Sequence, residues 1–319
     1  MTPVNNKRIG LALGSGSARG LSHIGVIQAL EEMGISPAIV CGSSIGAVVG
    51  AAYATGRLQA LQEWAESLTR MDVASFFNLS FYRSGFINIE RLQRFLTEVV
   101  DPQDSDIAAL QKTFAAVATD LESGCEYWFT QGSVRNAVQG SMSLPGLFNP
   151  MRHDGRWLVD GGLVNPIPVS VCKSLGADVV IAVNLNGDIV GKHSTHRHNS
   201  RAKHADSTQK NGADWHRDDG GNNIVAYVKN TLRSYSDSIF SNLNSAQDSP
   251  GLFETVAGSI NITQDRITRT RLAEDAPDIV LTPSLSHIAL LEFYRVGEAI
   301  EQGRMCVKKE KKRLKEILA

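Results

Sequence analysis

Residues 41–50 of the chain are CGSSIGAVVG, in which Ser44 is framed as Gly42-x-Ser44-x-Gly46. The apolar run PAIVCG predicts a short buried strand that ends here, and the run IGAVVGAAYATG predicts a small-residue helix that packs closely on a sheet. A strand, a tight turn and a helix are the context of a nucleophile elbow, where glycines at 42 and 46 keep the serine uncrowded. The pattern also fits a plain glycine-rich turn with Ser44 as the helix N-cap.

The segments around this stretch alternate between strand and helix patterns. RIGLAL (8–13) predicts a strand that ends in the loop GSGSARG, and LSHIGVIQALEEMG has helical spacing. TFAAVATDL and CEYWFTQG predict a strand pair, RWLVDGGLV a strand that enters a glycine turn, and GADVVIAVNL and PDIVLTPSL two buried strands. Helices are predicted for 90–100, for 222–240 and from about His287 to the end. The alternation favours an α/β layered fold.

The composition excludes several classes of protein. The chain has 319 residues, is 42% hydrophobic and has a formal net charge of -1, so it can build one large core or two modest ones and lacks the basic balance of nucleic-acid binders. The four cysteines fit no zinc or disulfide spacing, so we expect reduced thiols in a cytoplasmic protein. We expect no signal peptide and no spanning helix, because no apolar run reaches ~18 residues.

Two segments differ in character from the rest. Residues 188–223 are polar and contain five of the eight histidines, and we interpret them as a disordered insertion. The irregular histidine spacing argues against a metal site, and we expect no metal or cofactor. KKEKKRLKEIL (308–318) fits either a solvated terminal helix or a peripheral contact with anionic lipid head groups.

A carboxylate suited to act as a base ends the strand RWLVD. Asp160 is followed by Gly161 and Gly162, which allow a substrate or another backbone to come close. A carboxyl group in apolar surroundings binds its proton more tightly, as a general base must. Asp-Gly is also frequent in ordinary turns. None of the three histidines outside residues 188–223 has a recognisable catalytic setting.

The loop GSGSARG (14–20) offers backbone N–H groups beside a helix N-terminus, which suits an anion. A dinucleotide fingerprint fails, because Arg19 occupies the last glycine position of G-x-G-x-x-G. The other interpretation is an oxyanion hole for a tetrahedral intermediate at Ser44, where losing one donor typically costs ~3 kcal/mol.

Together and in this order, these motifs resemble the patatin-like phospholipase family. The matching stretches are GSGSARG followed by LSHIGV, the elbow GSSIG, SMSLPGLFNP, and Asp160-Gly161-Gly162 with NPIPV after it. The resemblance covers about residues 8–187, and we expect 224–319 to complete the fold with helices and a late strand. DAPDIVLTPSLSHIALLEFYRVGEAIEQG also resembles the bacterial branch that includes RssA. The resemblance implies a three-layer α/β/α sandwich with a central, mostly parallel sheet and a C-terminal helical extension.

The resemblance further implies a serine acyl hydrolase that cleaves carboxylic esters of lipids and phospholipids without a histidine. Ser44 would attack the ester carbonyl, and Asp160 would accept its proton and later activate water to hydrolyse the acyl-enzyme. The oxyanion donors would be the main-chain N–H groups of Gly16 and Ser17. Arg19 would add positive charge or brace the loop.

One departure from the family pattern concerns this loop. Family members commonly have three glycines where this chain has Ser15-Gly16-Ser17. A serine at position 17 costs energy if the backbone there needs a positive φ. A second hypothesis is therefore a weakly active or inactive regulatory or lipid-binding protein, and a third, a nucleotide-binding protein, rests on the glycine loop alone. An α/β-hydrolase fits poorly, because Ser44 follows only the second strand.

Overall fold

The computed structural model describes residues 7–76, 89–187 and 252–318. The chain divides into two units, one of 1–190 with 259–319 and one of 191–258. The first unit contains every motif singled out above. The predicted insertion at 188–223 and the predicted helix at 222–240 lie outside the described residues.

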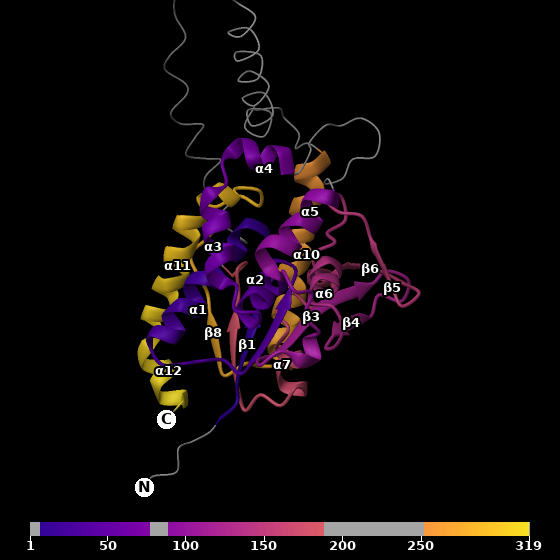
Figure 1. The fold of residues 1–319 in the computed structure, drawn as a ribbon. Coiled ribbons are helices and arrows are strands. Elements are labelled where there is room, and N and C mark those ends of the chain that lie inside the picture. Colours follow the sequence, from indigo (N-terminus) through magenta and orange to yellow (C-terminus); the bar gives the residue numbers. More distant parts are fainter. Residues whose placement is uncertain (1–6, 77–88, 188–251, 319) are drawn as a thin grey trace, which may run out of the picture. The chain divides into compact units, whose positions relative to one another are not determined.

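The described residues form an eight-stranded mixed sheet in the order β5-β6-β3-β2-β1-β7-β8, with β4 also paired to β3 (Figure 1). The strands are β1 Ile9–Leu13, β2 Ile39–Ser43, β3 Thr113–Asp120, β4 Glu126–Phe129, β5 Met151–His153, β6 Arg156–Asp160, β7 Val179–Val183 and β8 Ile279–Leu281. Strands β1, β2, β3, β7 and β8 are parallel, and β4, β5 and β6 pair antiparallel. The predicted fold class is confirmed.

Helices cover both faces of this sheet. They are α1 Ser22–Glu32, α2 Ile45–Ala54, α3 Leu58–Ser67, α4 Arg70–Phe76, α5 Ile89–Phe95, α6 Val134–Ser141, α7 Val169–Ser174, α10 Leu252–Glu274, α11 Val296–Lys309 and α12 Lys311–Leu318. The second half of the glycine loop forms a 3-10 turn at Ser17–Leu21, and the two glycines after Asp160 begin another at Gly161–Leu163. The strand β2 leads directly into the turn before α2, as its apolar run predicts.

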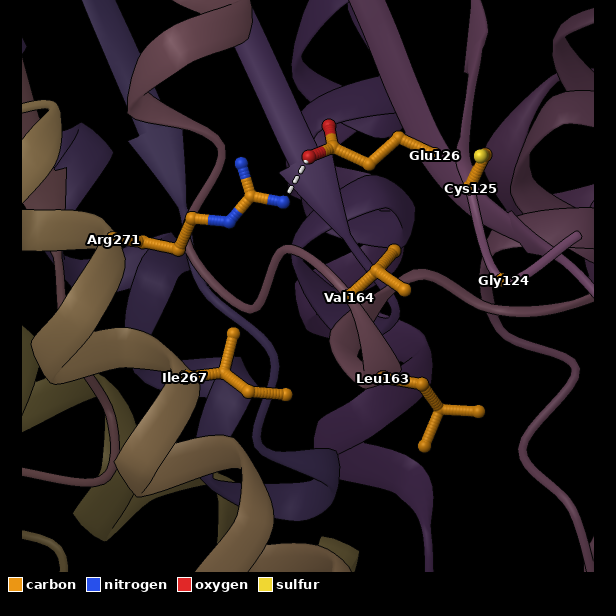
Figure 2. Close-up of a pocket in the computed structure, with 7 residues that line it drawn as sticks. All are labelled: Gly124, Cys125, Glu126, Leu163, Val164, Ile267 and Arg271. Atoms are coloured by element: carbon orange, nitrogen blue, oxygen red, sulfur yellow. Dashed lines mark ion pairs between the residues drawn. The ribbon is translucent and has the colours of Figure 1, made fainter.

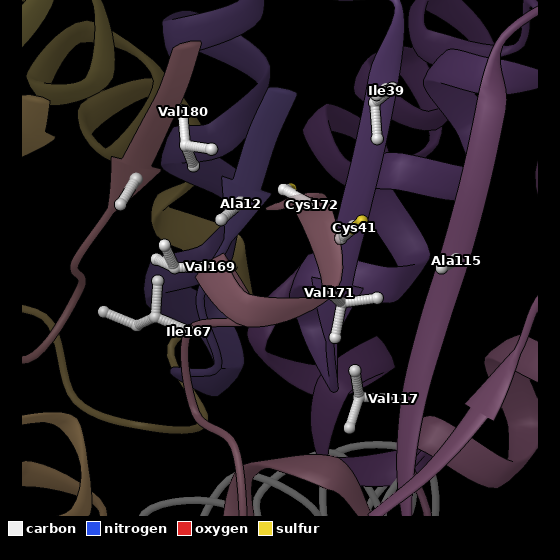
Figure 3. Packing of buried hydrophobic residues seen from close by; sticks show 11 residues of the cluster. Ala12, Ile39, Cys41, Ala115, Val117, Ile167, Val169, Val171, Cys172 and Val180 are labelled. Carbon is white, nitrogen blue, oxygen red and sulfur yellow. The ribbon is translucent and has the colours of Figure 1, made fainter. Parts of the chain in front are cut away.

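The alternating side chains of β2 contact helices on opposite faces of the sheet. Ile39 and Cys41 of β2 pack with Val171 of α7, in a cluster that Leu272 of α10 also joins (Figure 3). Val40 points the other way, toward Gly50 of α2. Both faces are therefore buried, and fully burying one such aliphatic side chain stabilises the fold by ~1.5–3 kcal/mol.

Two helices differ from the sequence-based expectation. The C-terminal helical pattern was expected from about His287, but α11 begins at Val296. The carbonyls of Ile288 and Leu290 accept hydrogen bonds from the side chains of Arg19 and Ser17, so contacts with the glycine loop hold this segment in its non-helical course. The predicted helix at 90–100 is α5 continued by a π-helical turn, Leu96–Val100.

Candidate active site

The register of β3 brings Ser44 and Asp160 together across 116 positions of sequence. Strand β4 occupies one edge of β3. On the other edge, β2 pairs with 113–117 and β6 takes over at 118–120. Ser43 lies opposite Val117, and Asp160 lies opposite Ala118. The residue that follows Ser43 and the last residue of β6 are therefore neighbours along one strand edge.

Ser44 sits in a strained turn between β2 and α2. Its φ is 57° and its ψ is -123°, a conformation that costs a non-glycine residue energy. Its N–H donates to the hydroxyl of Ser141 at 2.9 Å, and that hydroxyl donates to the Val117 carbonyl at 2.6 Å. Ser141, the last residue of α6, thus ties the turn to β3. No local sequence pattern indicated this role, although Ser141 opens the stretch SMSLPGLFNP.

Close contacts crowd the four glycines of the two motifs. A Cβ at Gly42 would lie 2.3 Å from the Gly46 backbone, and one at Gly46 would lie 2.1 Å from the Leu13 carbonyl oxygen. A Cβ at Gly161 would lie 2.0 Å from the carbonyl oxygen of Val117. A Cβ at Gly162 would instead meet side chains, with Gln264 Nε2 at 2.5 Å and Asp160 Oδ1 and Ser15 Cβ at 2.9 Å. The three contacts with backbone atoms are shorter than real Cβ atoms show, so positions 42, 46 and 161 exclude side chains, while position 162 is crowded by side chains that can shift.

The hydroxyl of Ser44 donates a hydrogen bond to Asp160 Oδ2 at 2.5 Å. The other oxygen of Asp160, Oδ1, accepts the N–H of Gly162 at 2.7 Å. Asp160 is fully buried, and this burial raises the pKa of its carboxyl from 3.8 to about 6, although the bonds from Ser44 and Gly162 favour the charged form. A base with such a pKa is ionised at neutral pH and can still hold a proton.

The glycine loop is held by contacts with the segment before α11. Ser17 has a φ of 52°, so this position does need the left-handed conformation. Its hydroxyl donates to the Leu290 carbonyl at 2.6 Å, and the N–H of Ala18 donates to the same oxygen at 3.0 Å. Arg19 is 3% exposed and its Nε donates to the Ile288 carbonyl at 2.8 Å.

His23 is buried behind the same loop. Its Nε2 lies 2.8 Å from the carbonyl oxygen of Gly14, and burial lowers its pKa to about 4. The neutral ring therefore donates to the loop backbone. His153 and His287 lie near the acidic side chains Asp154 and Glu298.

Figure 2 shows a pocket of about 570 Å³ whose wall includes Leu163 and Val164, just beyond the Asp160 motif. Arg271 of α10 forms an ion pair with Glu126 at 2.5 Å across it. In the described part of the chain, no three His, Cys, Asp or Glu side chains gather as a metal would need. Within those same residues, every helix is too short or too polar to cross a bilayer.

Comparison with known proteins identifies the relatives of this chain. Residues 11–173 match the family model of patatin-like phospholipases. An uncharacterised NTE family protein of Mycobacterium tuberculosis is 32% identical over 94% of this chain and 90% of its own. Patatin-like phospholipase domain-containing protein 6 of Homo sapiens is 36% identical over 56% of this chain and 13% of its own. VipD from Legionella pneumophila matches 96% of this chain and 77% of its own at 13% identity, with a TM-score of 0.36.

Proposed function

Because the chain belongs to the patatin-like phospholipase family, we propose that it hydrolyses carboxylic esters of lipids through a Ser44–Asp160 dyad. The observation that carries this proposal is the hydrogen bond from the Ser44 hydroxyl to the buried Asp160 carboxylate, at a strained turn that opens a helix. A nucleophile that is hydrogen-bonded to a base of raised pKa is the arrangement that nucleophilic catalysis needs.

In the proposed reaction, Ser44 Oγ attacks the ester carbonyl and its proton passes to Asp160 Oδ2. The tetrahedral intermediate collapses, the leaving alkoxide takes that proton from Asp160, and an acyl-serine remains. Asp160 then takes a proton from the water that attacks the acyl group, and returns it to Ser44 Oγ as the acid is released. The N–H groups of Gly16 and Ser17 would stabilise the oxyanion, and the N-terminus of α2 favours negative charge at Ser44.

The second candidate is a weakly active regulatory or lipid-binding protein. The strained serine at position 17 supports it, because a Cβ there adds a cost that the three-glycine pattern of the family lacks. The hydrogen bond from its hydroxyl to Leu290 opposes this cost, which favours the hydrolase.

The structure limits which face of α12 is available for the proposed contact with a membrane. Leu314 of α12 is buried, so the apolar face of this helix packs on the protein. Exposed Lys311, Lys312 and Lys315 remain for an electrostatic contact with anionic lipid at the cytoplasmic side. The RssA-like branch stays a prediction.

The test uses a fluorophosphonate probe, with mass spectrometry to locate the adduct, and a chromogenic short-chain ester in parallel. We expect an adduct on Ser44 that is lost in Ser44→Ala and Asp160→Asn. Ser43→Ala is the matched control, because Ser43 adjoins the nucleophile but donates its hydroxyl to the Asn165 carbonyl. It should keep both labelling and hydrolysis. Full esterase activity in Ser44→Ala would refute the proposal, and a folded wild type that takes no label would favour the second candidate.

A further inference from the structure

Helix α10 buries polar side chains where apolar ones would pack more easily. Gln264 is 5% exposed and Thr268, one turn later on the same face, is 2% exposed. Burying an amide costs free energy unless it is hydrogen-bonded. The helix also lies outside residues 11–173, the part of the chain that matches the family model. A buried glutamine at this place therefore calls for a specific contact.

The amide of Gln264 contacts both loops of the candidate active site. Ser15 Oγ, in the glycine loop, donates to Gln264 Oε1 at 3.3 Å. A methyl group at Gly162 would lie 2.5 Å from Gln264 Nε2, 2.9 Å from Ser15 Cβ and 2.9 Å from Asp160 Oδ1. Gln264, Ser15 and Gly162 thus form one packed cluster, which we call the Gln264 cluster.

The Gln264 cluster joins the two parts of the site that must be aligned for the reaction. The glycine loop carries the proposed oxyanion donors, and the N–H of Gly162 holds Oδ1 of the base Asp160. A backbone bond from Ser15 N–H to the Pro166 carbonyl, at 2.9 Å, links the same two segments from another side. A small displacement between donors and base reduces the rate of a preorganised reaction strongly.

We propose that Gln264 is a positioning residue, which clamps the glycine loop against the Asp160-Gly161-Gly162 turn and so completes the site from outside the matched family segment. This inference rests on the proposed hydrolase function. Gln264 acts through Ser15 and Gly162 rather than on the substrate. Its loss should therefore lower kcat and leave KM nearly unchanged.

The experiment measures kcat, KM and thermal stability for the full-length wild type, Gln264→Leu, Ser15→Ala, the double variant and Thr268→Val, with the same chromogenic ester. Gln264→Leu keeps the side-chain size and removes the amide. We expect kcat to fall about ten- to a hundredfold with KM within about twofold. Thr268→Val, equally buried on the same helix, controls for packing and should retain kcat.

Coupling separates positioning from general destabilisation. If Gln264 acts through Ser15, the double variant should be no slower than the slower single variant. Gln264→Glu keeps an acceptor for Ser15 and adds a negative charge beside Asp160. This charge should raise the pKa of Asp160, so the fall of kcat/KM on the acid side should move to higher pH. If Gln264→Leu does not fold, the pH dependence of Gln264→Glu still tests the positioning role of Gln264. Any one of three results would overturn this inference while leaving the proposed function intact. They are a wild-type kcat in Gln264→Leu, a loss of kcat in the double variant equal to the product of the two single losses, and an unchanged acid-side pH dependence of kcat/KM in Gln264→Glu. A folded but inert wild type would overturn the proposed function and this inference with it.

Discussion

Replacing the buried base Asp160 by its neutral isostere asparagine should make the protein more stable than the wild type, by a margin that grows as the pH rises. In Asp160→Asn, the amide oxygen can still accept the N–H of Gly162, and no charge is buried. In the wild type, the carboxyl has an ordinary pKa of 3.8 when unfolded and about 6 when folded. The folded state therefore holds a proton that the unfolded state has lost between these pH values.

The sign and size of the effect follow from this difference. Below about pH 3 the carboxyl is neutral in both states, and its burial carries no charge penalty. Between the unfolded pKa of 3.8 and the folded pKa of about 6 the wild type progressively loses free energy of unfolding, and above that range the folded state carries a charge fully shielded from water. Two pKa units correspond to about 3 kcal/mol. The advantage of Asp160→Asn should thus grow by about 3 kcal/mol between about pH 3 and pH 8.

Urea denaturation of both proteins at half-unit pH steps measures this advantage directly. Glu274→Gln, which neutralises an exposed carboxylate at the end of α10, is the control and should give a nearly constant difference from the wild type. The same Asp160→Asn preparation should have lost about 10²- to 10⁴-fold in kcat. A stability difference that is flat or falls with rising pH would refute the assignment of a strained, buried charge at this site.

Three further predictions concern the same centre. The kcat/KM of the wild type should fall below about pH 6, because protonated Asp160 cannot accept the proton of Ser44, and a pH series of initial rates tests this. Ser17→Gly should be more stable than Ser17→Ala by about 1 kcal/mol in thermal unfolding, since both lose the hydroxyl but only glycine relieves the φ of 52°; equal stabilities would contradict the strain. Ser141→Ala should lose about 1–3 kcal/mol of stability together with much of its kcat, because the N–H of Ser44 loses its acceptor; an unchanged kcat would show that this bond does not hold the elbow.

Local pattern was enough to predict most strands and to single out the two side chains of the proposed dyad. The apolar runs that became β1, β2, β3 and β7 are buried on both faces, so hydrophobicity alone marks them. The elbow at Ser44 was predicted because its glycines are forced by contacts within one strand–turn–helix unit. Asp160 was likewise predicted as a candidate base because it ends a strand and is followed by two glycines.

Partners far away in sequence could not be predicted in this way. Ser141 lies 97 positions from Ser44, and Gln264 lies 249 positions from Ser15. Nothing in the periodicity of α6 or α10 indicates which loop a polar side chain will reach. The start of α11 was misplaced for the same reason, because the carbonyls of Ile288 and Leu290 are bound by a loop near the other end of the chain.

If Ser44 and Asp160 react as proposed, the end-to-end arrangement of β2 and β6 on one edge of β3 makes hydrolysis a test of correct folding. A slip of β6 by one residue would turn the side chain of Asp160 to the opposite face of the sheet, away from Ser44. Such a chain would keep its helices, its strands and much of its buried surface, and circular dichroism would score it as native. Turnover would be absent, so specific activity counts the molecules whose parallel and antiparallel pairings are both in register.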